Sequence, residues 1–396
     1  MMFVLSLLNL QIDARLRQTF AYMKKESNHL AEIARLFLRL GITAFGGPAA
    51  HIAMMQREVV DKNKWMTHEH FLDLIGATNL IPGPNSTEMA IHVGHEKGGL
   101  KGLVLAGICF IGPAVIITLF VAWLYKKFGK LPAMQAFLYG VKPAIIAVIL
   151  AAIYPLLKKA SKTKGLILLG MLSLLCCFLG VNEIFVILGA GLLYLLLSLP
   201  ASGPARSLLS PSILQISYSA IFSAANMHLF WTFLKIGSIL YGSGYVLFAL
   251  LDAELVQKGL LSRQELIDAI AVGQFTPGPV FSAVTFIGYQ INGFSGALFS
   301  TIAVFLPSFI FVWILNPLIP QMRRSVHFGN FLDAVNIASL AAILYVCYQM
   351  GVSSLQDWRS ILIGLLAAAL LFTQKNINSA WVILGGSLAG YLLLLI

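Results

Sequence analysis

Charged residues are scarce in this chain, and their scarcity decides its broad class. Only 11% of its 396 residues are charged, whereas 58% are hydrophobic. A water-soluble domain has too little interior to bury so much apolar surface, and a disordered chain is far more polar. We therefore expect an all-α integral membrane protein, because a helix satisfies its own backbone hydrogen bonds inside a bilayer.

Acidic residues are rarer than basic ones, with 16 Asp and Glu against 27 Lys and Arg and a formal net charge of +11. The basic residues lie mainly in short connections such as Lys126–Lys127 and Lys158–Lys164. This distribution is typical of loops in membrane proteins. We therefore expect contact with the lipid bilayer and no nucleic-acid partner.

Cysteine is also scarce, and Cys109, Cys176, Cys177 and Cys347 all lie inside apolar stretches. None has the spacing of metal ligands, and buried thiols usually pack as small hydrophobic residues. We expect no disulfide, no metal site and no cofactor.

A cleavable signal sequence is not expected at the N-terminus. The apolar run at residues 3–10 has no basic residue before it and no small-residue cleavage site after it. Met23 offers an alternative start of translation. We expect residues 1–30 to form a cytoplasmic N-terminal segment.

The sequence does contain a duplication. The stretch Phe37–Gly41 returns as Phe233–Gly237 after 196 residues, and the Pro-Gly-Pro at 82–84 returns at 277–279 after 195 residues. So few gaps over this length indicate that a whole domain is duplicated. We expect two homologous helical repeats and a turn-rich linker, at residues 31–200, 226–396 and 201–225 respectively.

Both repeats contain apolar segments that are broken by glycine or proline. Gly46-Gly47-Pro48 and Gly242-Ser243-Gly244 occupy matching positions, and such residues destabilise the interior of a helix. Each segment is either one discontinuous span or a re-entrant hairpin. Six full spans per repeat would keep the repeats parallel, whereas five would invert the second repeat.

Loop charge favours inversion. Residues 158–164 contain four lysines, whereas Arg359 is the one basic residue in the matching loop at 353–359. We therefore expect an inverted topology with about 10–12 membrane segments, most of them near the length that crosses a bilayer.

Helix starts inside a membrane favour an anion-binding site, because free N–H groups and the positive end of the helix dipole face the cavity. Paired broken segments mark the binding site between the halves of many transporters. For each Pro-Gly-Pro the alternative is a kink that only serves packing. The expected substrate contacts are the glycines and polar residues at these starts, namely Gly46, Gly47, Gly83, Asn85, Ser86, Thr87, Gly242, Gly244 and Gly278.

Charged residues inside apolar segments are further candidates, since each costs about 2.5–3.5 kcal/mol at a helix centre. Arg39 and its repeat mate Lys235 precede the glycine breaks and could neutralise an anion. Alternatively they extend to the membrane interface or pair with Glu32 and Asp252. His51, which follows the first break, is a candidate donor.

Three acids could couple transport to protons. Glu88 follows Pro84 by one turn, and Asp73 and Asp268 match across the repeats. A carboxyl in a low-dielectric cavity binds a proton more tightly, as a proton-coupled carrier requires. The alternative for each is a helix-end acid paired with a nearby base.

Three motifs carry a resemblance to a known family. Residues 45–52 (FGGPAAHI), 79–90 (NLIPGPNSTEMA) and 271–280 (AVGQFTPGPV) together resemble the chromate ion transporter family in its long two-domain form. The resemblance adds Gln274 to the candidate contacts. It implies a multi-pass carrier of the bacterial inner membrane that exports chromate and gives chromate resistance, with sulfate as a similar anion. It also implies drive from the membrane potential or the proton gradient.

We therefore expect a secondary active transporter that exports chromate, a tetrahedral oxyanion. A carrier or passive channel for another inorganic anion such as sulfate stays open, and so does a homodimer. An enzyme is not expected, because the chain has no long soluble loop with clustered acids or a metal motif.

Overall fold

The computed structural model describes residues 29–44, 47–78, 80–128, 132–198, 224–241, 245–315, 325–374, 377 and 379–394. Within these ranges the chain is helical and contains no strand. Gly46, Gly242 and Gly244 lie outside the described residues, as do most of the expected N-terminal segment and most of the linker.

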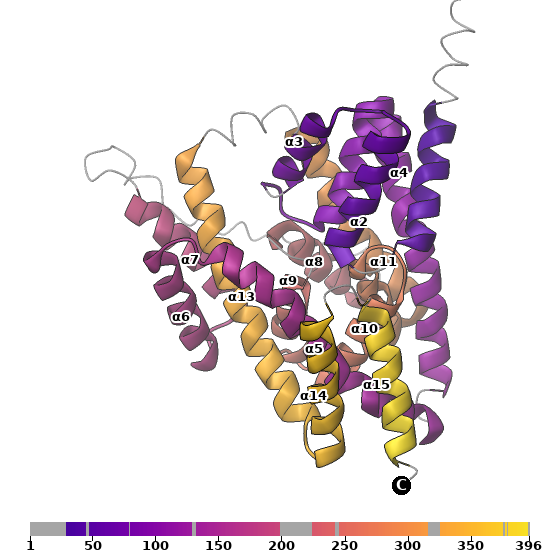
Figure 1. Ribbon diagram of the computed structural model, residues 1–396, viewed down its shortest axis with the longest axis vertical. Helices are drawn as coiled ribbons and strands as arrows, with labels where there is room; N and C mark the ends of the chain where they lie inside the picture. Colours follow the sequence, from indigo (N-terminus) through magenta and orange to yellow (C-terminus); the bar gives the residue numbers. More distant parts are fainter. Residues whose placement is uncertain are drawn as a thin grey trace, which may run out of the picture.

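The two repeats contain the same series of helices (Figure 1). The first begins with a helix at residues 29–43 and continues with α2 (Gly47–Gln56), η1 (Arg57–Lys62), α3 (His68–Thr78), α4 (Asn85–Phe128), α5 (Pro132–Ala160), α6 (Lys164–Phe178) and α7 (Glu183–Ser198). The second contains α8 (Ala224–Ile239), α9 (Val246–Leu251), η3 (Asp252–Val256), α10 (Arg263–Phe275), η4 (Val280–Ser282), α11 (Ala283–Leu315), α13 (Val326–Ser354), α14 (Trp358–Thr373) and α15 (Ser379–Leu394).

The duplication extends to local irregularities. The segments η1 and η3 are both π-helical and occupy equivalent positions. The long helices α4 and α11 both lose helical geometry at one point, at Gly98–Gly99 and at Asn292–Gly293. The expected pair of homologous helical repeats is therefore confirmed.

These two points are tight turns between the arms of a hairpin. A Cβ added to Gly94 would lie 2.4 Å from the Gly102 carbonyl oxygen, and one added to Gly288 would lie 2.4 Å from that of Gly296. Eight residues of straight helix would separate such groups by about 12 Å. The chain therefore reverses, and the long arms of α4 and α11 run over 100–128 and 294–315.

Corresponding helices of the two repeats run in opposite directions. Lys162, just after α5, pairs with Asp333 near the start of α13 at 2.7 Å. Asp357, just after α13, accepts a hydrogen bond from Tyr139 near the start of α5, and this bond lowers the pKa of Asp357. Each helix is about 40 Å long, so the end of each lies at the start of the other. The expected inverted topology is confirmed.

The long arms of α4 and α11 show the same antiparallel relation. Gln290, near the turn of α11, donates a hydrogen bond of 3.1 Å to the Ala122 carbonyl near the end of α4. At the other end, a Cβ added to Gly107 would lie 2.3 Å from the ring of Phe309. Contacts at both ends thus support the inversion independently of α5 and α13.

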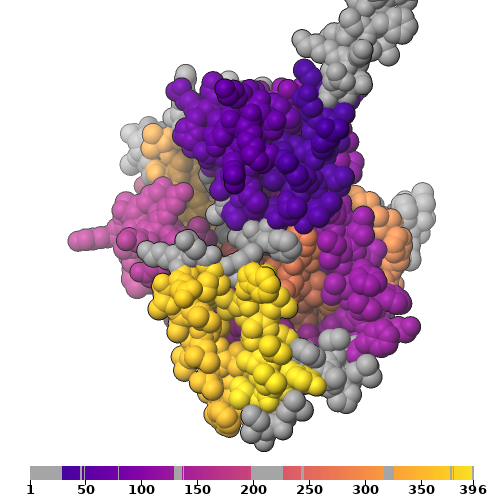
Figure 2. Space-filling view, turned by 45° about the vertical axis from the view of Figure 1, so that its right-hand side comes forward, coloured from indigo at the N-terminus to yellow at the C-terminus, as the bar shows by residue number. Residues whose placement is uncertain are grey.

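The repeats interlock through their later helices. Helix α5 packs against α14 and α15 of the second repeat, and its counterpart α13 packs against α6 and α7 of the first. In Figure 2 the C-terminal helices (yellow) occupy one end of the visible face, and the first helices of the chain (indigo) occupy the other. Neither repeat therefore forms a separate domain.

The helices that surround this core suit a membrane. In the described ranges α4, α11, α13 and Leu138–Ala160 are long and apolar enough to cross a bilayer, and α6, α7, α14 and α15 are shorter apolar helices. Large apolar side chains such as Ile116, Phe185 and Trp381 are 69%, 74% and 72% exposed. So much exposed apolar surface marks contact with lipid, and the protein is a multi-pass membrane protein.

The broken segments of the first repeat are re-entrant hairpins. Arg39 pairs with Glu58, although 19 residues of straight helix would span about 28 Å. Likewise, His70 near the start of α3 lies 3.5 Å from Glu96, just before the turn of α4. Both segments thus enter and leave the protein on one side, so the first broken segment is a re-entrant hairpin and not a discontinuous span.

Candidate functional site

The tips of the re-entrant hairpins meet at the boundary between the repeats. The Gly83 N–H donates a hydrogen bond of 2.7 Å to the Leu240 carbonyl, and the Gly278 N–H donates one of 2.8 Å to the Ala44 carbonyl. Leu240 and Ala44 are equivalent positions that follow the first helix of each repeat. We call this pair of reciprocal bonds the crossing.

Glycine is required at both donors of the crossing. Gly83 and Gly278 have φ angles of +142° and +88°, which side chains rarely allow. A Cβ at Gly278 would lie 3.2 Å from the Gly41 carbonyl oxygen. Because both N–H groups are bonded to carbonyls, a ligand at the crossing needs other donors.

The first half-site surrounds Gly83 and is polar. A Cβ added there would lie 2.2 Å from Glu88 Oε1 and 2.5 Å from Ser308 Oγ of α11. Glu88 and Thr87 belong to the first turn of α4, and neither is exposed to solvent. Thr87 and Glu88 of the first repeat and Ser308 of the second thus form a buried polar cluster around the Gly83 loop.

The second half-site, around Gly278, has different chemistry. The position equivalent to Ser308 is Ala114, whose Cβ lies near Gly278, and the position equivalent to Glu88 is Ala283. Its hydroxyl groups bond one another, with Thr118 Oγ1 lying 3.2 Å from Ser282 Oγ. The crossing is therefore symmetric in backbone and asymmetric in side chains.

Several buried polar atoms of the first half-site have no hydrogen-bond partner. They are Thr87 Oγ1 and, one turn further along α4, both ring nitrogens of His92. The Glu88 carboxyl and the Ser308 hydroxyl are neighbours of each other. Atoms without a partner are uncommon because each costs free energy when buried. A polar ligand that enters the crossing would satisfy them.

Of the polar triplet expected at the start of α4, Ser86 and Thr87 are buried and Asn85 is partly buried. The predicted donor His51 holds the crossing itself. Its Nε2 lies 3.1 Å from the Ala44 carbonyl, which also accepts from Gly278. The structure thus brings these residues to the same region as Gly83 and Gly278.

Gly47 and Gln274 approach each other through Tyr245. A Cβ added to Gly47 would lie 3.7 Å from the Tyr245 hydroxyl, and Tyr245 lies beside the Gln274 side chain. Tyr245 comes from the second repeat and Gly47 begins α2 of the first. This contact joins the two glycine breaks across the boundary.

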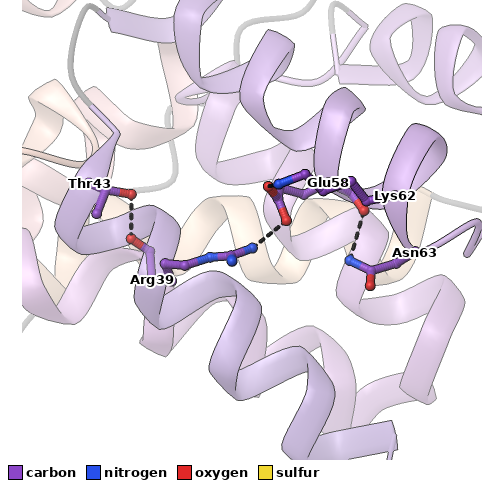
Figure 3. Close-up of polar contacts among 5 residues, drawn as sticks. All are labelled: Arg39, Thr43, Glu58, Lys62 and Asn63. Atoms are coloured by element: carbon purple, nitrogen blue, oxygen red, sulfur yellow. Dashed lines mark hydrogen bonds and ion pairs between the residues drawn. The ribbon is translucent and has the colours of Figure 1, made fainter.

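The structure places Arg39 and Lys235 away from the crossing. Arg39 pairs with Glu58, which also accepts from Lys62 at 2.5 Å (Figure 3). The second repeat has the same triad, in which Lys235 and Lys258 lie 2.5 and 2.7 Å from Glu254. We call these the ion triads; each joins the two arms of a re-entrant hairpin.

The three predicted acids lie in different surroundings. Glu88 belongs to the first half-site, whereas Asp73 is exposed on α3. Asp268 is buried, and it accepts hydrogen bonds from Tyr125 at 2.6 Å and from Gln264 at 3.0 Å. Of the three, Glu88 is the buried acid that faces the loop of Gly83, with the Ser308 hydroxyl beside it.

A profile of the chromate transporter family matches the chain twice, over residues 31–195 and 227–391. The chain belongs to the chromate transporter family. The two matched stretches each contain one set of re-entrant hairpins, so each repeat of this chain contributes half of the crossing. No solved structure gave a significant match.

Curated relatives of this chromate transporter family member match it over most of their length. A "Chromate transport protein" of Cupriavidus metallidurans is 29% identical, with 91% of this chain and 92% of the relative covered. A "Probable chromate transport protein" of Synechococcus elongatus is 29% identical at 85% and 88% coverage. An "Uncharacterized transporter" of Methanocaldococcus jannaschii is 29% identical at 94% and 96% coverage.

Ser308 and Tyr245 were not predicted from the sequence. Ser308 follows Pro307, which repeats Pro113 after 194 residues, so its position in a matched pair was a usable signal. Tyr245 directly follows the second glycine break. Tyrosine is common on apolar helices, and only its contact with Gly47 distinguishes this one.

Proposed function

We propose that this protein is a secondary active carrier that exports a tetrahedral oxyanion, chromate with sulfate as its analogue, across the bacterial inner membrane. The observation that carries the proposal is the crossing, because two inverted repeats there surround buried polar atoms without partners. Inverted repeats with broken helices that meet at one site are the architecture of alternating-access carriers. The names of the relatives support chromate as the substrate.

In this proposal the anion is held by side-chain donors. Thr87 Oγ1 is a buried donor without a partner. The buried Ser308 hydroxyl and Gln274 amide lie beside Glu88 and Tyr245 respectively, and both can turn to an oxyanion, which offers four acceptors. Gly47, Gly83 and Gly278 allow close approach of the backbone, and Asn85, Ser86 and His51 complete the surroundings. Arg39 and Lys235 act at the hairpin arms and do not touch the anion.

The distribution of basic residues supports an orientation. Among the described residues, the face where α5 ends and the hairpin of α4 turns carries eight lysines near its helix ends, namely Lys62, Lys64, Lys97, Lys101, Lys158, Lys159, Lys162 and Lys164. In the same ranges the opposite face carries five basic residues near its helix ends, namely Lys126, Lys127, Lys258, Arg263 and Arg359. By the positive-inside rule the lysine-rich face is cytoplasmic. The first repeat then opens its re-entrant hairpins toward the cytoplasm and the second opens its own outward.

Export of a divalent anion from a negative-inside cell is electrically favourable. Each charge gains about 2.3 kcal/mol per 100 mV, so export of the divalent anion by itself gains about 4.6 kcal/mol per 100 mV. A carrier with this orientation can expel the anion without a chemical fuel. Such a protein would give resistance to chromate.

The test is chromate accumulation in inside-out membrane vesicles, with and without an uncoupler and with sulfate as competitor. We expect energy-dependent accumulation, inhibition by sulfate, and loss of accumulation in the variants Thr87→Val and Gln274→Leu. Thr373→Val is the matched control, because Thr373 is exposed at the end of α14. Accumulation that is equal in empty and protein-containing vesicles would refute the proposal.

A further inference from the structure

Glu88 is a buried acid without a cation. Its side chain is 0% exposed, and the donor beside its carboxyl is the neutral Ser308 hydroxyl. Among the described residues no Lys, Arg or His forms an ion pair with it, whereas Glu58, Glu254 and Asp252 each have a basic partner. A charge so placed is expensive unless it is neutralised. These surroundings favour a neutral carboxyl over a carboxylate.

The groups that face Glu88 are few and uncharged. From α11 comes Ser308, a neutral hydroxyl, and from the segment after α8 comes the Tyr241 phenol. On its own helix, His92 lies one turn further, buried and without partners. None of these groups supplies a positive charge that would stabilise a carboxylate. The surroundings therefore favour the protonated, neutral form of Glu88.

Asp268 provides an internal comparison. It is as buried as Glu88, but it accepts hydrogen bonds from Tyr125 and Gln264 and lies near the Lys142 ammonium. A carboxylate with donors and a counter-charge can remain ionised. Glu88 has the neutral Ser308 hydroxyl beside it and, among the described residues, no counter-charge, and it is adjacent to the loop that holds the crossing.

The repeats differ at this position in a way that favours a ligand role. The equivalent of Glu88 is Ala283, and the equivalent of its neighbour Ser308 is Ala114. Alanine satisfies packing at both positions of the second half-site, so packing alone does not call for an acid and a hydroxyl. The polar pair is specific to one side of an otherwise symmetric crossing.

We propose that Glu88 is protonated whenever the oxyanion occupies the crossing, so that each divalent anion crosses the membrane together with one proton. The proposal rests on the transport function proposed above and adds the coupling ion to it. A carboxylate beside a dianion would be repelled at close range in a low dielectric, so binding of the anion requires that the acid be neutral. The proton comes from water as the anion binds and returns to water on the other face as it leaves.

The consequence is a stoichiometry. Wild-type protein moves one net negative charge per divalent anion, and the apparent affinity for the anion falls about tenfold per pH unit above the titration of Glu88. In Glu88→Gln the neutral amide replaces the protonated acid. That variant moves two net charges per anion, and its affinity for the anion is independent of pH.

The experiment is the reversal potential of chromate flux in proteoliposomes at alkaline pH, where chromate itself is divalent. Wild type, Glu88→Gln and the control Asp61→Asn are compared; Asp61 is exposed on η1. We expect a reversal potential set by one charge and by the pH gradient for wild type and Asp61→Asn, and by two charges alone for Glu88→Gln.

Each outcome decides a separate question. Wild-type flux that carries two charges and ignores the pH gradient overturns the proton proposal and leaves the carrier function intact. Absence of any wild-type chromate flux overturns the function instead. If Glu88→Gln does not insert, the charge carried by wild type alone decides between one and two. A Glu88→Gln protein that keeps the pH dependence also overturns the proposal.

Discussion

The amide of Gly83 donates a hydrogen bond of 2.7 Å to the carbonyl of Leu240, which follows the first helix of the opposite repeat. The two residues are 157 positions apart in the chain. The equivalent pair, Gly278 and Ala44, makes the reciprocal bond. Each loop that carries proposed substrate contacts is therefore held in place by the opposite repeat. A change that moves one of these loops should disturb transport.

Gly83→Ala should disable transport. The added Cβ would lie 2.2 Å from Glu88 Oε1 and 2.5 Å from Ser308 Oγ, at a φ of +142°. Relief of such overpacking costs about 1–3 kcal/mol and moves the loop, so we expect chromate transport to fall at least about tenfold. Gly112→Ala is the control, because a Cβ there meets no atom within 4 Å. Equal transport by both variants would contradict the geometry of the first half-site.

The ion triads should tolerate an exchange of charges. Arg39→Glu places two acids opposite each other across the first hairpin, and like charges in contact repel strongly; we expect transport to fall about tenfold or more. The double variant Arg39→Glu/Glu58→Arg restores the pair and should recover most of the activity. If Arg39 instead binds the anion directly, the double variant stays inactive.

Helices α5 and α15 pack closely, and of the two consecutive glycines Gly385 and Gly386 in α15 only Gly386 should be needed for this packing. A Cβ at Gly386 would lie 2.7 Å from the Ala144 Cβ and 2.9 Å from the Gly140 carbonyl, whereas one at Gly385 meets nothing within 4 Å. Gly386→Ala should lower the melting temperature in detergent, at a cost of about 1–3 kcal/mol. Gly385→Ala should leave it unchanged or raise it slightly. The opposite order would contradict the interlocking of the repeats.

Much of this fold could be predicted from the sequence, because Gly, Pro and apolar periodicity carry its main signals. The duplication and the broken helices are visible in repeated residues such as Pro82 and Pro277. The partners of Arg39 and Lys235 were not predictable in the same way. The sequence offered Glu32 and Asp252, and the structure pairs them with Glu58 and Glu254 because each hairpin turns back on itself.

The crossing could not be predicted from the sequence, and the reason is physical. Backbone hydrogen bonds between distant loops depend on N–H and carbonyl groups that every residue carries, so no residue type marks them. The orientation was also undecided, since Lys126–Lys127 and Lys158–Lys164 flank the same helix. The structure adds Lys97 and Lys101 to one of these faces through the hairpin of α4.

The inverted topology predicts opposite accessibility of two loops. In a background without the native cysteines, Lys159→Cys lies in the last turn of α5 at the lysine-rich face and Gln356→Cys lies after α13 at the other; both positions are exposed. A membrane-impermeant thiol reagent added to intact cells should label Gln356→Cys and not Lys159→Cys. In inside-out vesicles the pattern should reverse. Labelling of both from one side would contradict the antiparallel relation of α5 and α13.

If the crossing forms one anion site, the purified protein should bind chromate there. Equilibrium binding should show one chromate per chain, displaced by sulfate. The variants Thr87→Val and Gln274→Leu should weaken binding at least about tenfold each, because a hydrogen bond to a charged group contributes about 1.5–3 kcal/mol. Binding that is absent in wild type, or that is unchanged in both variants while Thr373→Val behaves as wild type, would contradict the account.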